Sequence, residues 1–260
     1  MILMFIASML MGLLLASLLH HKKSKQTLKD KHVVISGGSS GIGLELARGA
    51  FKAGARVTLV ARNEERLKQS IETFGETPVR IGYVSVNLSS DINAIEKAMR
   101  PAIEARGDVD VLINCAGSAV ASYVDDTSEQ MYRQMMDTNF YSAVNLTKAC
   151  LVSLEKQCVA KGVASVVFVS SVAGLMGIFG YSAYSPSKFA LVGFAQTLLA
   201  EKQDLGLHVM VAFPPDTETP GYANENVGKP LETVAISNLG GLQKPAAVAA
   251  GILDDICKLR

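Results

Sequence analysis

Short hydrophobic runs alternate along this chain with longer stretches in which apolar residues recur every three or four positions. The runs predict six strands, at residues 32–36, 56–61, 80–87, 109–114, 163–170 and 208–213. The longer stretches predict helices at residues 42–53, 64–74, 91–105, 128–156, 184–203 and 246–259. Strands joined by helical crossovers of this length pair in parallel through right-handed connections. We therefore expect an α/β fold over residues 32–260: one doubly wound, mostly parallel sheet of the Rossmann type, with helices on both faces.

The first nineteen residues form a separate run that contains no charged side chain. As a helix this run would rise roughly 28 Å, close to the roughly 30 Å hydrocarbon core of a bilayer. Residues 20–31 follow as a linker with five lysines and one acid, Asp30. We predict a membrane anchor at residues 1–19, with the basic flank and the rest of the chain in the cytosol.

Two other interpretations of residues 1–19 are weaker. A cleavable signal peptide needs a positive segment before its apolar core, whereas the basic cluster here comes after it. A helix packed on a soluble domain has one apolar face, and this run is apolar on every side.

Composition narrows the class of protein. Hydrophobic residues make up 49% of the chain and charged residues 19%, which is typical of an ordered globular protein and not of a disordered one. The net charge of +1 argues against a nucleic-acid-binding protein, which carries a basic excess. The four cysteines show neither zinc-site nor disulfide-framework spacing, so we expect a reducing compartment and no metal site.

A glycine-rich turn joins the first predicted strand to the first predicted helix. Gly37, Gly41 and Gly43 give the spacing G-x-x-x-G-x-G. Such a turn needs positive φ and close backbone approach, and the following helix offers free N–H groups to a pyrophosphate. A glycine-rich turn alone is often only a turn, but its place between strand and helix predicts dinucleotide binding. The expected contacts are Gly37, Ser39, Ser40, Gly41, Ile42 and Gly43.

The end of the second predicted strand favours NADPH over NADH. A site for NADH places Asp or Glu there to bond the ribose hydroxyl, but this chain has Ala61, Arg62 and Asn63. Arg62, with Arg66 one helical turn later, can pair with a 2′-phosphate. Alternatively, both arginines are ordinary solvated surface residues.

Tyr184 and Lys188 carry the chemistry of a ketone reduction. At positions i and i+4 they share a helix face, so the ammonium is expected to lower the pKa of the tyrosine from about 10. A tyrosine acid can protonate a ketone oxygen while hydride reaches the carbon. Ser171 follows the fifth predicted strand and can bond the same oxygen. The adjacent Ser170 points to the opposite strand face, so we prefer Ser171.

These motifs resemble the short-chain dehydrogenase/reductase superfamily over residues 32–257. The resemblance also rests on Asn114-Cys115-Ala116-Gly117 and on Asn139 in a predicted helix. It implies a catalytic set in which Tyr184 donates the proton and Ser171 polarises the ketone, while Lys188 holds the ribose and Asn139 anchors a water. The further cofactor contacts that it implies are Asn87, Asn114, Gly117, Tyr184, Lys188, Pro214, Thr217 and Thr219.

A narrower resemblance, to the 3-ketodihydrosphingosine reductases, rests on residues 57–64, 214–226 and 229–233. It implies NADPH-dependent reduction of a long-chain sphingoid ketone at the cytosolic face of the endoplasmic reticulum membrane, with residues 214–240 as a lipid-facing loop. It also implies membrane lipid as a partner and a possible homodimer through the helices at 128–156 and 184–203. Pro215 stands where most of the superfamily has glycine, which favours this family over a steroid or retinoid oxidoreductase.

Two features of the sequence depart from the family pattern. Asn87 replaces the usual aspartate beside the adenine. The sequence also ends at Arg260, before the seventh strand and hydrophobic tail that the resemblance implies, so it is either a shortened variant or a fragment, with six predicted strands. An alternative, non-enzymatic function is that of a sensor that binds a dinucleotide without catalysing a reaction. This function is disfavoured because Ser171, Tyr184 and Lys188 are all present.

Overall fold

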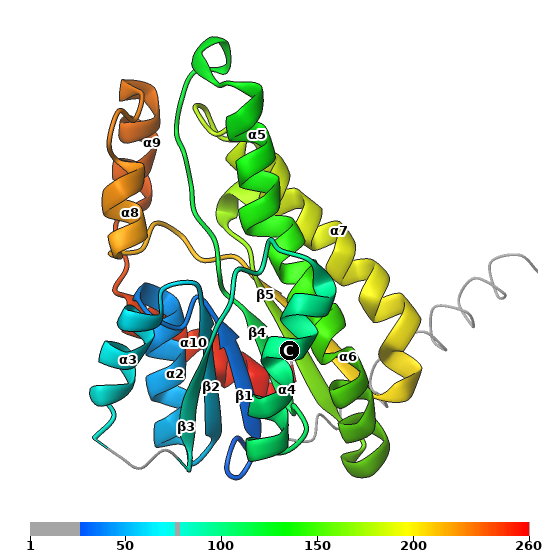
Figure 1. Cartoon of the computed structure of the whole chain (residues 1–260). Helices are drawn as coiled ribbons and strands as arrows, with labels where there is room; N and C mark the ends of the chain where they lie inside the picture. The colour runs from blue at the N-terminus through cyan, green and yellow to red at the C-terminus, as the bar shows by residue number, and fades with distance from the viewer. Residues whose placement is uncertain (1–26, 76–78, 260) are drawn as a thin grey trace, which may run out of the picture.

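A computed structural model describes residues 27–75 and 79–259 of the chain (Figure 1). These residues form one parallel sheet in the order β3-β2-β1-β4-β5-β6, which confirms the predicted Rossmann-type α/β fold. The strands are β1 (His32–Ser36), β2 (Arg56–Ala61), β3 (Ile81–Ser85), β4 (Val111–Asn114), β5 (Ala164–Val169) and β6 (Leu207–Ala212). All six overlap the predicted strands, and β3, β4 and β5 are shorter than predicted.

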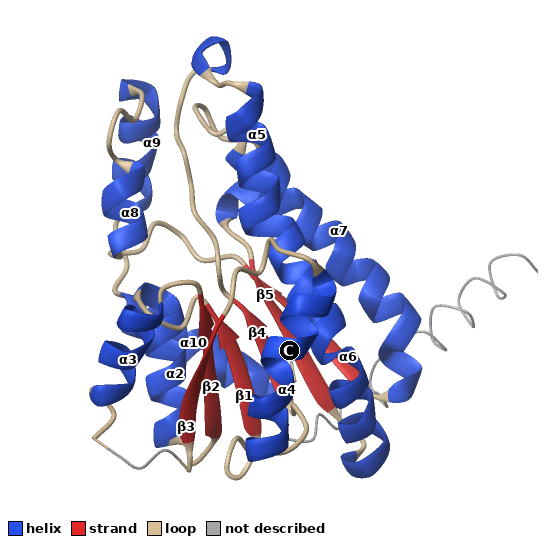
Figure 2. Cartoon of the chain, in the orientation of Figure 1, coloured by secondary structure: helices blue, strands red, loops and turns tan. Residues whose placement is uncertain are grey.

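Helices cover both faces of the sheet (Figure 2). One face carries α2 (Gly41–Lys52), α3 (Glu64–Glu72) and α10 (Pro245–Lys258); the other carries α4 (Ile92–Arg106), α6 (Ser142–Lys161) and α7 (Tyr184–Lys202). Alternation along β1 explains the two cores: Val33 and Ile35 point to the first set of helices, and Val34 points to the second. Both cores are apolar, so the sheet is buried on each side, as parallel sheets require.

Two predicted segments need correction. The single helix predicted at 128–156 is instead α5 (Glu129–Met135), a π-helix (Met136–Tyr141) and then α6. The loop predicted at 214–240 contains α8 (Pro220–Glu225) and α9 (Leu231–Gly240). Hydrophobic periodicity does not reveal these two helices because α8 buries no residue and α9 buries only Thr233. Local signals determine where α8 begins. The Thr219 side chain caps the helix by accepting a hydrogen bond from the Tyr222 N–H, and Pro220 follows Thr219 as the first helical residue.

The predicted anchor at residues 1–19, and most of the basic linker, lie outside the described residues. Within residues 27–75 and 79–259, no helix combines the length and the apolar character that a membrane crossing demands.

A buried polar cluster ties β1 to β4 at the amino ends of the strands. Asp110, which is 1% exposed, accepts from the Lys31 and Lys161 ammonium groups at 3.0 and 2.8 Å and from the His32 N–H at 2.9 Å. Burial raises the pKa of Asp110, but the three donors outweigh it and lower the pKa overall. The His32 ring lies between the Gly107 carbonyl and the Thr58 hydroxyl, and burial lowers its pKa to about 4. The imidazole is therefore neutral at physiological pH.

Candidate active site

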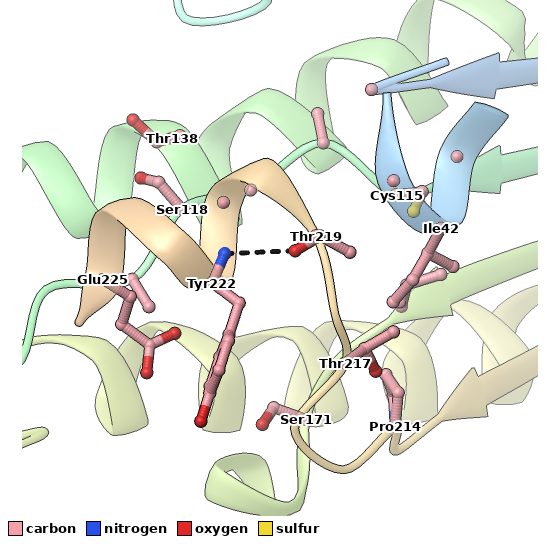
Figure 3. Close-up of a pocket in the computed structure, with 18 of the residues that line it drawn as sticks. Ile42, Cys115, Ser118, Thr138, Ser171, Pro214, Thr217, Thr219, Tyr222 and Glu225 are labelled. Atoms are coloured by element: carbon pink, nitrogen blue, oxygen red, sulfur yellow. Dashed lines mark hydrogen bonds between the residues drawn. The ribbon is translucent and has the colours of Figure 1, made fainter. Parts of the chain in front are cut away.

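A cavity of about 600 Å³ lies at the carboxyl ends of the strands, where ligands bind in open α/β sheets. Its wall comes from the turn after β1, the ends of β2 to β6 and the segment that includes α8 (Figure 3). Most of the predicted site residues line it: Gly37, Ser39, Ser40, Gly41, Ile42, Gly43, Arg62, Arg66, Asn87, Gly117, Ser171, Tyr184, Lys188, Pro214, Thr217 and Thr219. Asn114 and Asn139 do not.

The glycine turn is packed so closely against the loop after β4 that larger residues are excluded. Gly37 has a φ of 68°, and a Cβ atom there would lie 3.0 Å from the Ala116 backbone. A Cβ atom on Gly43 would lie only 2.3 Å from the Gly37 carbonyl oxygen. The Ser36 hydroxyl fixes the same contact by accepting from the Cys115 and Ala116 N–H groups, each at 3.0 Å. The turn is therefore a rigid edge of the cavity.

The amino end of α2 is suited to an anionic group. Ser40 occupies the N-cap position, but its side chain makes no capping hydrogen bond to the helix. The N–H groups of the first turn, from Gly41 to Gly43, are thus left uncapped by a side chain in residues that line the cavity. Uncapped N–H groups and the positive end of the helix dipole fit a pyrophosphate.

Arg62 and Arg66 line the cavity where β2 ends. Both are exposed, and among the described residues neither guanidinium takes part in an ion pair. The Asn63 side chain caps α3 by accepting from the Arg66 N–H at 2.8 Å, which fixes the backbone between the two arginines. Asn87 lies at the neighbouring strand end, where its side-chain Oδ1 accepts from the Ser89 N–H at 3.2 Å. These groups fit the adenosine end of a dinucleotide.

The two asparagines that do not line the cavity, Asn114 and Asn139, are buried behind its wall and bond to segments that form it. Asn114 is buried and donates to the Thr147 hydroxyl at 3.0 Å. Asn139, in the π-helix, is fully buried and donates to the Ser118 carbonyl and the Ser187 hydroxyl, each at 2.9 Å, while it accepts from the Ser118 N–H at 2.9 Å. Its side chain fixes the loop after β4 to α7.

Ser171, Tyr184 and Lys188 meet at one end of the cavity. The Ser171 hydroxyl lies close enough to the Tyr184 phenol to lower its pKa, and the Lys188 ammonium lies 5.7 Å from the centre of the Tyr184 ring. Lys188 donates to the Val169 carbonyl at 3.0 Å. The neighbouring Ser170 is buried and donates to the Lys188 carbonyl at 3.1 Å, so it is turned away from the phenol. The geometry favours Ser171 over Ser170, as expected from strand alternation.

The ionisation of this group differs from the sequence-based expectation, which had Lys188 lowering the pKa of Tyr184. Desolvation raises the pKa of Tyr184 above its ordinary value, the neighbouring Ser171 hydroxyl lowers it, and the charges of Glu225 and Asp216 raise it further. Lys188 is not among the groups that shift the pKa of Tyr184, and its ammonium donates to the Val169 carbonyl. Burial lowers the pKa of Lys188 itself to about 8. Tyr184 is therefore protonated at neutral pH, which is the form a proton donor needs.

The sequence assigned no role to several residues that lie around this end of the cavity. Tyr222 and Glu225 project from α8 toward the segment that carries Ser171 (Figure 3). Glu225 accepts from the Tyr181 hydroxyl and pairs with Lys229 at 2.7 Å. No periodic pattern marks these residues, because α8 has only six residues and buries none.

The profile of the short chain dehydrogenase family matches residues 31–229, which contain the glycine turn, Ser171, Tyr184 and Lys188. The chain belongs to the short-chain dehydrogenase family. This dehydrogenase is 40% identical over 232 residues to the 3-dehydrosphinganine reductase of Danio rerio, covering 88% of this chain and 69% of that protein. It is 37% identical over 265 residues to the 3-ketodihydrosphingosine reductase of Dictyostelium discoideum, covering 95% and 79% respectively.

Among solved structures, the dehydrogenase resembles an actinorhodin polyketide ketoreductase that was crystallised with NADPH. The TM-score is 0.75 at 27% identity, and the match covers 86% of this chain and 88% of the ketoreductase. Family membership, the uncapped N–H groups of α2 and the set of Ser171, Tyr184 and Lys188 agree with one another. The protein is an oxidoreductase that acts on a ketone and takes a nicotinamide dinucleotide.

Proposed function

We propose that this dehydrogenase reduces the 3-keto group of 3-ketodihydrosphingosine to the alcohol, dihydrosphingosine, with NADPH. The observation that carries the proposal is the 40% identity to a 3-dehydrosphinganine reductase over 88% of the chain. The intact set of Ser171, Tyr184 and Lys188 beside the cavity supports it.

The choice of NADPH rests on the end of β2. Arg62 and Arg66 line the cavity there, and their guanidinium groups match a 2′-phosphate. The residue that follows β2 is Arg62, where a ribose-binding carboxylate would favour NADH. When bound, the cofactor supplies a hydride for the carbonyl carbon.

Tyr184 and Ser171 carry the proton side of the reaction. Ser171 donates a hydrogen bond to the ketone oxygen, and the protonated Tyr184 phenol gives its proton to that oxygen as the alcohol forms. The phenolate left behind is stabilised by Ser171, and the Val169 carbonyl holds the Lys188 ammonium beside the Tyr184 ring. A proton from solvent then restores the phenol, so one hydride and one proton are consumed in each turnover.

The substrate's long alkyl chain needs an apolar path out of the cavity. Ile178 and Ile236 line the cavity, and exposed apolar side chains continue outward on α9 and on the segment before Tyr181. Leu239 on α9 is 90% exposed, and Phe179 is 46% exposed. These residues support a lipid substrate that reaches the site from a membrane.

The proposal includes attachment of the enzyme to the endoplasmic reticulum membrane, with the catalytic domain in the cytosol. Residues 1–19 support it as an uncharged apolar run that the linker at 20–31 follows with five lysines. The substrate is itself a membrane lipid. The anchor would hold the cavity near the bilayer in which that lipid resides.

A homodimer through α6 and α7 is also part of the proposal. Both helices expose apolar side chains to solvent: Val152 and Val159 on α6 are 66% and 78% exposed, and Phe189 on α7 is 43% exposed. We propose that these side chains form the surface on which two copies of the chain meet.

The test is turnover of a substrate panel by the purified full-length chain in mixed micelles. NADPH oxidation is followed by absorbance, and the lipid product is identified by mass spectrometry. We expect dihydrosphingosine to form from 3-ketodihydrosphingosine, and the Tyr184→Phe variant to form little of it. Turnover of steroid or retinoid ketones without turnover of the sphingoid ketone would reject the proposed substrate.

A further inference from the structure

Two carboxylates line the cavity, and both belong to the end that holds Tyr184. They are Asp216, on the loop after β6, and Glu225, on α8. Two of the cationic residues in the wall, Arg62 and Arg66, follow β2, away from Tyr184. The third, Lys188, lies beside Tyr184 and donates to the Val169 carbonyl at the end of β5. The end of the cavity in which the substrate headgroup reacts therefore holds both carboxylates together with the Lys188 ammonium.

The negative charge of Glu225 is balanced by a lysine of the same chain, Lys229. Its carboxylate pairs with the Lys229 ammonium at 2.7 Å and accepts from the Tyr181 hydroxyl. The Lys229 side chain is 1% exposed, and its ammonium lies 4.8 Å from the centre of the Tyr222 ring and 5.7 Å from that of Tyr181. This buried pair fixes α8 to the segment before α7 and leaves no net charge.

Asp216 differs, because its carboxylate has no partner among the described residues. Its backbone is held rigidly, since the Gln243 N–H donates to the Asp216 carbonyl at 2.9 Å and the Glu218 N–H donates to the Gln243 carbonyl at 2.9 Å. The Thr217 hydroxyl closes the same turn on the Pro215 carbonyl at 2.8 Å. A half-buried, unpaired carboxylate on a fixed turn, inside a catalytic cavity, is arranged to meet a cation.

The negative charge of Asp216 affects the pKa of the Tyr184 phenol. Desolvation raises the pKa of Tyr184, and the charges of Glu225 and Asp216 add to that increase, so Asp216 lies within electrostatic range of the phenol. Asp216, Ser171 and Tyr184 line the same cavity, so a ketone bound to Ser171 and Tyr184 would share that cavity with the Asp216 carboxylate.

We propose that Asp216 binds the ammonium group on the carbon adjacent to the ketone, and so makes the enzyme specific for 2-amino ketones. The inference rests on the proposed function, because 3-ketodihydrosphingosine carries a primary amine on that carbon. The ion pair anchors the headgroup and directs the ketone oxygen to Ser171 and Tyr184. The bound ammonium also offsets the negative charge that Asp216 places near the phenol.

The test compares two substrates with NADPH: 3-ketodihydrosphingosine and the same long-chain ketone with hydrogen in place of the amino group. The measured quantity is the ratio of kcat/KM for the amino ketone to kcat/KM for the amine-free ketone. We expect Asp216→Asn to lower this ratio about tenfold to hundredfold, the range for losing a hydrogen bond to a charged group. Asp216→Glu, which keeps the charge, should lower it less.

Glu218→Gln is the matched control, because it removes a carboxylate from the same loop outside the cavity. Glu218 pairs with Lys244, and its side chain is 55% exposed. Glu218→Gln should keep the wild-type ratio. A ratio in Asp216→Asn equal to that of wild type overturns the inference, while wild-type turnover of the amino ketone leaves the proposed function standing. If the wild type does not reduce the amino ketone, the proposed function and this inference both fail.

A measurement on the wild-type enzyme covers the case in which the Asp216 variants do not fold. A long-chain primary amine should inhibit reduction of the amine-free ketone at least about tenfold more strongly than the alcohol of equal length, since only the amine can form the charged hydrogen bond. Equal inhibition by the amine and the alcohol overturns the inference.

Discussion

Replacement of Arg62 tests the assignment of NADPH. The Arg62 side chain lines the cavity and has no ion-pair partner among the described residues, so its guanidinium is free for a phosphate. A phosphate monoester carries about −1.5 to −2 charges at neutral pH, and one charge-assisted hydrogen bond contributes about 1.5–3 kcal/mol. Because Arg62 is exposed and Arg66 remains nearby, we take the lower end of that range.

Arg62→Gln should therefore raise the KM for NADPH about tenfold, and Arg62→Glu, which adds repulsion, about a hundredfold. The KM for NADH should change less than about threefold, since NADH lacks the phosphate. The assay is the initial rate with each cofactor at a saturating ketone concentration. Arg133→Gln is the matched control, because Arg133 is an exposed arginine that bonds to Glu129 and does not line the cavity. Equal increases in KM for the two cofactors would refute the 2′-phosphate role.

Three further predictions concern the proton chemistry and the stability of the fold. Tyr184→Phe should lower kcat more than about a hundredfold, the usual contribution of a general acid, and kcat within tenfold of wild type would contradict its role. Since burial lowers the pKa of Lys188 to about 8, kcat/KM for reduction should fall as pH rises through about 8 and the ammonium is lost; a flat profile to pH 10 would argue against that dependence. Burial lowers the pKa of His32 from 6.5 to about 4, so the unfolded chain takes up the proton first and stability is lost as pH falls between those values. The free energy of unfolding in urea should be about 2 kcal/mol lower at pH 5 than at pH 7.5, with a smaller difference in His32→Gln.

The parts of the fold that the sequence predicted are those that local pattern determines. Buried strands such as β1 and β5 read as short apolar runs, and the glycines at 37, 41 and 43 mark a turn that only small residues can form. Tyr184 and Lys188 could be paired because their spacing places them on one helix face. The same reasoning separated Ser171 from Ser170, since neighbouring residues of a strand point in opposite directions.

The rest depends on contacts between distant segments, which local pattern does not encode. The side chain of Asn139 bonds to Ser118 and Ser187, and these contacts form only after β4, the π-helix and α7 have assembled. The pKa of Tyr184 was expected to be lowered by Lys188, yet desolvation raises it, and desolvation is a property of the folded cavity. Asp216 was visible in the sequence only as part of a motif. Only the folded structure shows that Glu225 is paired with Lys229 while the Asp216 carboxylate has no partner among the described residues.

Isotope transfer from the cofactor to the lipid tests the central claim most directly. The full-length enzyme is given NADPH that carries two deuterium atoms at the reactive carbon of the nicotinamide ring, together with 3-ketodihydrosphingosine. The proposed function predicts dihydrosphingosine with one deuterium on carbon 3 and none elsewhere, formed in an amount equal to the NADPH oxidised. Absence of the product, or product without deuterium at that carbon, would contradict it.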